Sequence, residues 1–134
     1  MATEESYPED LRYHPEHDWA RIDGDEATFG VTWFAQDSLG DVVFVELPAV
    51  GTTLTQGQIF GVVESNKTIS DLFAPVSGEV VAINETLREK PEQVNGDPYG
   101  EGWMLRVALA NPGEVSSLLD ATAYQEFVAS EQAK

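Results

Sequence analysis

The stretch Val62-Val63-Glu64-Ser65-Asn66-Lys67-Thr68-Ile69-Ser70-Asp71-Leu72-Phe73 carries the most information about how this chain folds. Two strand-like runs, rich in apolar and β-branched residues, flank the polar tetrad Glu64 to Lys67. Short apolar runs with a brief polar interruption are typical of two strands joined by a tight turn. The pattern therefore predicts a β-hairpin that presents Lys67 at a solvated tip.

More strand-like segments lie on both sides of this hairpin. They cover residues 17–22, 27–31, 41–47, 78–84 and 103–108, and the two runs of the hairpin itself cover 59–64 and 68–73. Asp23-Gly24-Asp25 predicts a hairpin turn after the first segment, and Pro48 ends the third. Residues 85–102, which are rich in Pro, Asn, Asp and Gly, are expected to form a loop. Many short strands at regular spacing predict a small β-sandwich or barrel.

Three other segments carry helix signals. Thr32 is suited to cap a short helix that runs to Ser38, and Gly40 is suited to the position after its end. The Asn-Pro-Gly-Glu sequence at 111–114 has a capping-box pattern. A final helix is expected after Asp120, with one apolar face made of Tyr124, Phe127 and Val128. We expect one domain covering residues 1–134, mainly β, with residues 1–10 flexible.

Composition excludes several classes of function. The chain has 24 acidic and 7 basic residues and a formal charge of −17, so its surface repels nucleic-acid backbones. This acidity serves either solubility or electrostatic steering towards basic partners. No apolar run is long enough for a transmembrane helix, and the acidic N-terminus is neither a secretory signal nor a transit peptide. We expect a protein of a bacterial-type cytoplasm, or a processed form in the mitochondrial matrix.

Cysteine is absent from the chain. The protein therefore has no thiol of its own, and sulfur redox chemistry would need a prosthetic group. His14 and His17 are too few for a metal site. His17 next to Asp18 lacks a serine or cysteine partner for a catalytic dyad. These observations indicate a protein without catalytic residues of its own.

Lys67 is the residue that most needs an explanation. Glu64 and Asp71 flank it in sequence and favour a charged amine, which disfavours a Schiff-base role. Two interpretations remain from the residues alone: a solvated turn lysine, or an attachment point that another enzyme modifies. Spacing by itself favours the first interpretation.

The segment from Glu64 to Val80 resembles the lipoyl-lysine hairpin of the biotinyl/lipoyl carrier family. That family has a glutamate three residues before the lysine and a glycine eleven residues after it, and Glu64 and Gly78 occupy these places. Biotin carriers have methionine on both sides of the lysine, whereas Asn66 and Thr68 flank it here. The resemblance therefore implies lipoate on Lys67 in preference to biotin.

A more specific resemblance, over residues 11–128, is to the H proteins of the glycine cleavage system. The segments that carry it are 11–13, 17–19, 39–48, 91–95 and 97–103. It implies a barrel-sandwich hybrid fold and a non-catalytic carrier. On lipoyl-Lys67 the carrier would take an aminomethyl group from a glycine decarboxylase (P protein) to an aminomethyltransferase (T protein). A dihydrolipoamide dehydrogenase (L protein) would reoxidise it.

The resemblance also implies how lipoate is attached. A lipoate ligase or a lipoyl/octanoyl transferase would recognise the hairpin through Glu64, Asp71 and Gly78. An alternative function is a lipoyl relay or storage protein, which delivers lipoate to other complexes.

Two positions depart from the family pattern. Phe34 stands where these proteins commonly have a histidine, and Asp18 replaces the usual glutamate before Trp19. Both positions are associated with the cleft that receives the loaded arm. Trp33 and Phe34 either pack in the core or form an apolar wall for the arm. We expect Asp18 to pair with the ammonium of the cargo.

Overall fold

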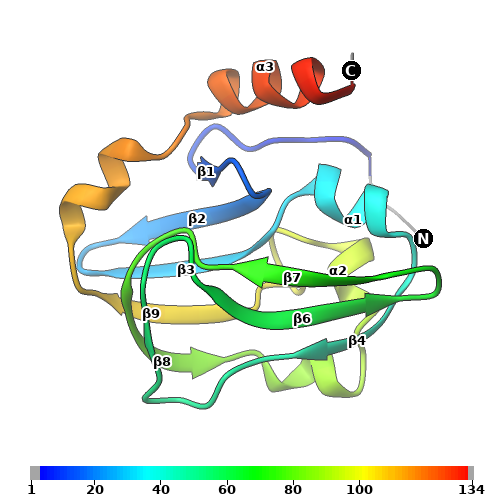
Figure 1. Ribbon diagram of the computed structural model, residues 1–134, viewed down its shortest axis with the longest axis horizontal. Coiled ribbons are helices and arrows are strands. Elements are labelled where there is room, and N and C mark those ends of the chain that lie inside the picture. The colour runs from blue at the N-terminus through cyan, green and yellow to red at the C-terminus, as the bar shows by residue number, and fades with distance from the viewer. Residues whose placement is uncertain (1–3, 133–134) are drawn as a thin grey trace.

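The structure is a computed structural model that describes residues 4–132, and within this range the strands form two antiparallel sheets (Figure 1). The larger sheet has the strand order β1-β2-β3-β9-β8-β5, and the smaller has the order β4-β6-β7. Neither sheet closes into a barrel across the described residues. The prediction of a mainly β fold with short antiparallel strands, a small internal helix and C-terminal helices is confirmed.

The strand bounds agree with most of the predicted segments. The larger sheet contains β1 (Arg12–His14), β2 (Asp18–Asp23), β3 (Glu26–Val31), β5 (Thr53–Leu54), β8 (Gly78–Ile83) and β9 (Leu105–Leu109). The smaller sheet contains β4 (Val42–Glu46), β6 (Ile59–Ser65) and β7 (Ile69–Phe73). The predicted β6–β7 hairpin is present, and β4 pairs with the other edge of β6. Figure 1 shows the hairpin running out to one side of the molecule, beside helix α1.

Helix α1 (Trp33–Leu39) begins and ends as its capping signals predict. The hydroxyl of Thr32 accepts a hydrogen bond from the backbone N–H of Ala35 at 3.2 Å. Gly40 follows the helix with φ of 84°, a backbone conformation in the left-handed region that favours glycine. A side-chain cap of this kind contributes about 1 kcal/mol to stability.

The C-terminal segment differs in part from its prediction. Residues 112–117 form a 3-10 helix, η2 (Pro112–Ser117), which Asn111 caps as expected. The capping-box prediction is wrong for Glu114, because its carboxylate accepts hydrogen bonds from the N–H and hydroxyl of Ser77 instead, both at 2.7 Å. Helix α3 (Ala121–Gln132) begins after Asp120, whose side chain accepts from the N–H of Ala123.

The expected loop at 85–102 contains two short helices, η1 (Glu85–Arg88) and α2 (Gln93–Gly96). Tertiary contacts hold α2, since the buried Asn95 amide donates to the carbonyl of Gly40 and accepts from the N–H of Val42, both at 2.8 Å. The short strands β1 and β5 were also not predicted. Each is stabilised by pairing with a longer neighbour, which local sequence does not reveal.

Apolar side chains gather in two clusters. The larger cluster lies between the sheets, and the smaller joins the N-terminal strands to α3. In the smaller cluster the rings of Tyr13 and Tyr124 stack at 4.7 Å between centroids. α3 therefore lies over β1 and β2, as Figure 1 shows.

The flexibility expected for residues 1–10 stays a prediction. Residues 1–3 lie outside the described part of the chain, and the Tyr7 ring packs against Tyr124 at 5.4 Å. The described part has no helix that is long and apolar enough to cross a membrane.

Candidate functional site

The tip of the β6–β7 hairpin is a four-residue turn organised by one serine. The buried Ser65 pairs with Thr68 through its backbone N–H at 2.8 Å. Its hydroxyl accepts from the N–H of Lys67 at 3.2 Å and from that of Thr68 at 3.1 Å. The turn backbone is thus held firmly, whereas the Lys67 side chain is exposed. This arrangement exposes the amine on a backbone that the fold holds in place.

The other side of the tip rests on the end of α1. The N–H of Asn66 donates to the carbonyl of Asp41 at 2.9 Å. A Cβ added at Gly40 would lie 3.2 Å from Asn66 Oδ1 and 3.3 Å from Lys67 Cε. Glycine at this position therefore allows close approach in addition to a positive φ. The tip is fixed relative to the rest of the molecule by contacts from both sides.

Glu64 lies near the end of β6, on the outer face of the small sheet. It pairs with Phe44 on β4 and with Ile69 on β7, and residues that pair directly project from the same face. Phe44 is 49% exposed and Ile69 is 65% exposed. The half-buried Glu64 is therefore flanked by two exposed apolar side chains.

The structure does not bring Gly78 to the hairpin tip. Gly78 belongs to β8 in the larger sheet, where it pairs with Leu54 and Leu109. A Cβ at this position would collide with the backbone carbonyl of Ala108. The glycine is needed for close strand pairing, and its recognition by an attaching enzyme stays a prediction.

A cleft of about 190 Å³ runs between β7 and α1, and three of the predicted residues line it: Asp18, Phe34 and Asp71. They come from β2, α1 and β7 respectively, so only the fold brings them together. Leu39 and Val63 supply apolar wall at the same cleft. Trp33 is not among the residues that line it.

Asp18 is the most unusual group in this cleft. It is 2% exposed, and its Oδ2 atom has no hydrogen-bond partner within the described residues. Burial, and then the nearby negative charge of Glu16, raise the pKa of this carboxyl well above its usual 3.8. A buried acceptor without a partner is costly, so a cation entering the cleft would find a site ready to bind it.

His17 was considered from the sequence only for a metal site or a catalytic dyad, and its place in the cleft was missed. Its ring lines the cleft and lies 4.8 Å from the ring of Phe34. Nδ1 is 2.7 Å from the hydroxyl of Tyr124, and Nε2 is 3.4 Å from a carboxylate oxygen of Glu131. Because both partners lie on α3, no local signal near residue 17 could have found them.

The backbone and the electrostatics of His17 are also unusual. Its φ of 73° lies in the left-handed region, which costs free energy for a residue with a side chain. Burial lowers the pKa of its imidazole, although Glu131 and Glu16 act in the opposite direction. The ring therefore adds a largely neutral polar group to the cleft next to the apolar Phe34.

No group of three or more metal-ligating side chains gathers within residues 4–132. The site as described combines an exposed, braced lysine with a neighbouring cleft that has a buried carboxyl at one wall. Such an arrangement suits a group tethered to Lys67 that can leave the surface and return to the cleft.

Comparisons with known proteins agree with this description. The family model described as glycine cleavage H-protein matches residues 11–131. A glycine cleavage system H protein of Symbiobacterium thermophilum is 58% identical over 120 residues, which cover 90% of this chain and 94% of that protein. A probable glycine cleavage system H protein of Haloarcula marismortui is 56% identical over 121 residues, which cover 90% and 95%.

A solved structure shows the same likeness in three dimensions. The crystal structure of a glycine cleavage system H protein from Mycobacterium marinum superposes with a TM-score of 0.82. It is 39% identical in sequence, and the match covers 93% of this chain and 98% of that one. The resemblance seen in the sequence is therefore confirmed, and the chain belongs to the glycine cleavage H-protein family.

Proposed function

We propose that this protein is the lipoyl carrier of a glycine cleavage system and that lipoate is attached to Lys67 by an amide bond. The observation that carries the proposal is the geometry of the tip, where Ser65 fixes the backbone and leaves the lysine side chain exposed. Lys90 is exposed as well, but it follows a 3-10 helix and has no comparable hairpin around it. The carrier domain is proposed to span residues 1–134.

The residues next to the hairpin fit a long tethered group. Ser70 and Asp71 line the cleft three and four residues beyond Lys67, so the strand rise places them roughly 10–13 Å along β7. Phe34 and Leu39 offer apolar contact for a hydrocarbon chain. Lipoate, when bound, supplies a dithiolane that carries a one-carbon amine between enzymes.

The chain's own part in the reaction is to bind and shield that amine. Buried Asp18 has an acceptor atom without a partner, and it would accept hydrogen bonds from an ammonium group in the cleft. The cation would in turn favour the ionised carboxylate and reduce the cost of burying Asp18. His17 and Phe34 then close one wall and limit the access of water.

The enzymes that we propose as partners are the P, T and L proteins and the lipoate ligase or lipoyl/octanoyl transferase. A carrier with a charge of −17 is suited to meet them by electrostatic steering. The tethered arm presents its cargo at high effective concentration to each enzyme in turn. Recognition of the tip by Glu64 and Asp71, and a cytoplasmic location, stay predictions.

The attachment is tested by intact mass after incubation with a lipoate ligase, lipoate and ATP. The wild-type protein should gain one lipoyl group and Lys67→Arg should gain none, with unchanged folding because the side chain is exposed. Lys90→Arg is the matched control and should still gain one group. A lipoyl group on Lys67→Arg would rule out this attachment site.

The relay or storage function is the alternative, because a protein that carries no glycine-derived cargo would better tolerate Phe34 in place of a polar cleft residue. The structure weakens that reason, since His17 places a polar ring at the same wall of the cleft. Purified P, T and L proteins separate the two functions. Carbon dioxide released from glycine only when the lipoylated protein is present supports the shuttle, whereas transfer of lipoate to another acceptor without such release supports the relay.

A further inference from the structure

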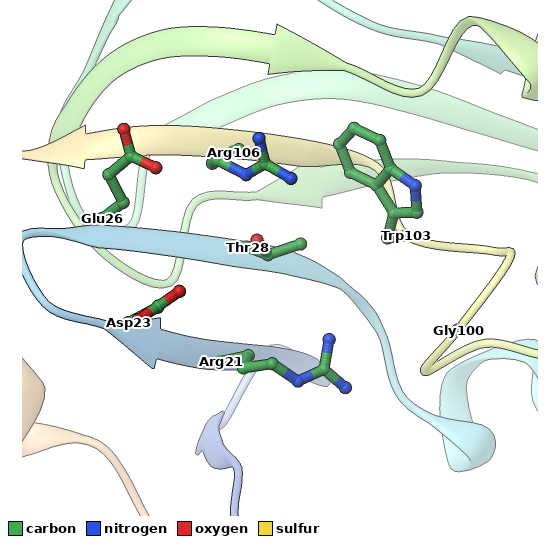
Figure 2. A pocket seen from close by; sticks show the side chains of 7 residues that line it. All are labelled: Arg21, Asp23, Glu26, Thr28, Gly100, Trp103 and Arg106. Carbon is green, nitrogen blue, oxygen red and sulfur yellow. The ribbon is translucent and has the colours of Figure 1, made fainter.

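A second pocket, of about 520 Å³, lies on the solvent-facing side of β2, β3 and β9 (Figure 2). Its walls come from these strands and from the loop that precedes β9. It shares no lining residue with the cleft between β7 and α1, and no residue of the β6–β7 hairpin lines it. The carrier function therefore gives no account of it.

The strand register arranges the charges of this pocket in two rows. Arg21, Thr28 and Arg106 pair directly across the three strands, so they form one row on a common face. Asp23 and Glu26 pair with each other two residues further along and form the second row. The rise of a strand separates the rows by roughly 6–7 Å. Figure 2 shows both guanidinium groups towards the Gly100 loop and both carboxylates at the opposite end.

The cationic row is held in place by contacts other than ion pairs. Arg21 donates to the carbonyl of Tyr99 at 3.0 Å, and its guanidinium lies 5.0 Å from the ring centroid of Trp19. The guanidinium of Arg106 lies 5.7 Å from the ring of Trp103. Within residues 4–132 neither arginine has a carboxylate within 4.0 Å. Opposite charges thus face the same pocket without neutralising each other by contact.

The overall charge narrows the class of ligand that fits. A simple anion would gain contacts with the two arginines but would enter the field of a protein with charge −17. A simple cation would be drawn to Asp23 and Glu26 but would leave the arginines without a partner. A ligand that carries both charges meets both rows at once and experiences little net repulsion.

We propose that this pocket binds a zwitterion whose carboxylate lies between Arg21 and Arg106 and whose ammonium lies between Asp23 and Glu26. The rows are roughly 6–7 Å apart at the backbone. Because the two kinds of charged group extend towards opposite ends of the pocket, the charges of the ligand must be at least that far apart, as in an ω-amino acid or an extended dipeptide. Thr28 lies in the middle of the cationic row, where its hydroxyl can donate to the carboxylate. Trp103 forms an aromatic wall beside the proposed position of the ligand's carboxylate.

A titration with ω-amino acids of increasing length tests the proposal, with the indole N–H signal of Trp103 in NMR spectra as the readout. Glycine, 4-aminobutyrate and 6-aminohexanoate are the zwitterionic probes, and butyrate and butylammonium each carry one of the two charges. Saturable shifts are expected with 4-aminobutyrate and 6-aminohexanoate and weaker binding with the other three. Glycine is too short to reach both rows.

Variants connect the signal to the two rows. Arg106→Gln and Glu26→Gln should each weaken binding by up to about fivefold, as expected for partly exposed charge contacts. Arg88→Gln removes an exposed arginine outside the pocket and should change nothing. Equal binding of butyrate or butylammonium, equal weakening by Arg88→Gln, or no saturable shift with any probe would overturn the proposal. Lys67→Arg should bind as the wild type does, so this result is independent of lipoylation.

Discussion

Replacing Asp18 by asparagine should stabilise the unmodified protein at neutral pH. The wild-type carboxyl is 2% exposed, and one of its oxygens has no partner in the described structure. At pH 7 the fold must either bury a negative charge or keep a proton that an aspartate normally releases near 3.8. Asparagine has nearly the same shape and carries no charge, so it avoids both costs.

The titration of Asp18 sets an upper limit to the effect. Keeping a proton from the ordinary aspartate pKa up to pH 7 costs at most roughly 4 kcal/mol. The oxygen without a partner adds nothing to the gain, because the amide of asparagine leaves a polar atom in the same place. Asp18→Asn should therefore raise the free energy of unfolding at pH 7 by up to about 4 kcal/mol. For a chain of this length each 1 kcal/mol corresponds to about 3 °C in Tm.

The pH dependence of this gain follows from the raised pKa of Asp18. Below 3.8 the carboxyl is protonated in both folded and unfolded chains, so the variant gains little. Above that pH the unfolded chain releases the proton first, and the wild type loses stability until the pH passes the folded pKa. The gain of the variant should thus grow from pH 4 to pH 7.

Thermal unfolding followed by circular dichroism between pH 4 and pH 7 measures this gain. Asp37→Asn, which changes an exposed aspartate on α1, is the control and should shift stability by less than about 0.5 kcal/mol. A variant that is less stable at pH 7, or equally stabilised at every pH, would refute the reasoning.

The same substitution should harm the carrier. Without the carboxylate, an ammonium cargo in the cleft loses its charged partner, and the half-life of the loaded arm in the absence of the T protein should fall. Greater stability together with shorter protection is the expected result for a group retained for function at a cost in stability. An unchanged half-life would mean that Asp18 does not contact the cargo.

Four further predictions concern other parts of the molecule. Phe34→His should lengthen the half-life of the loaded arm, because it adds a polar contact to the cleft wall; an unchanged half-life would leave Phe34 as ordinary packing. Glu131→Gln should lower the pKa of His17 further, since the carboxylate raises it, while the pKa of His14 stays constant as an internal NMR control. Gly78→Ala should lower the free energy of unfolding by about 1–3 kcal/mol, because the added Cβ collides with the facing strand. The correctly folded fraction should still accept lipoate, and a stable variant that accepts none would instead support direct recognition of Gly78. Raising the salt concentration from low to physiological should slow association with partner enzymes, because charges are then screened over about 8 Å. An association rate that does not change with salt would mean that the acidic surface serves solubility alone.

Local signals sufficed for much of this fold. The β6–β7 hairpin, the turn at Gly24 and the caps of α1 were all predictable because each depends on neighbouring residues alone. Prediction failed where a side chain forms its hydrogen bonds with residues that are distant in the sequence. Glu114 bonds to Ser77 instead of capping its own helix. The short helix α2 is held through Asn95, whose partners lie more than fifty residues away.

In the functional site, too, some features depend on local sequence and others on tertiary packing. The exposed lysine at the hairpin tip and the family resemblance could be read from the sequence, because a turn and its flanking strands are continuous in the chain. The cleft could not, since β2, α1, β6 and β7 each contribute part of it, while α3 supplies the partners of His17. Burial of Asp18 and the contacts of His17 depend on which segments pack together in space, and desolvation, which shifts both pKa values, exists only after that packing has excluded water.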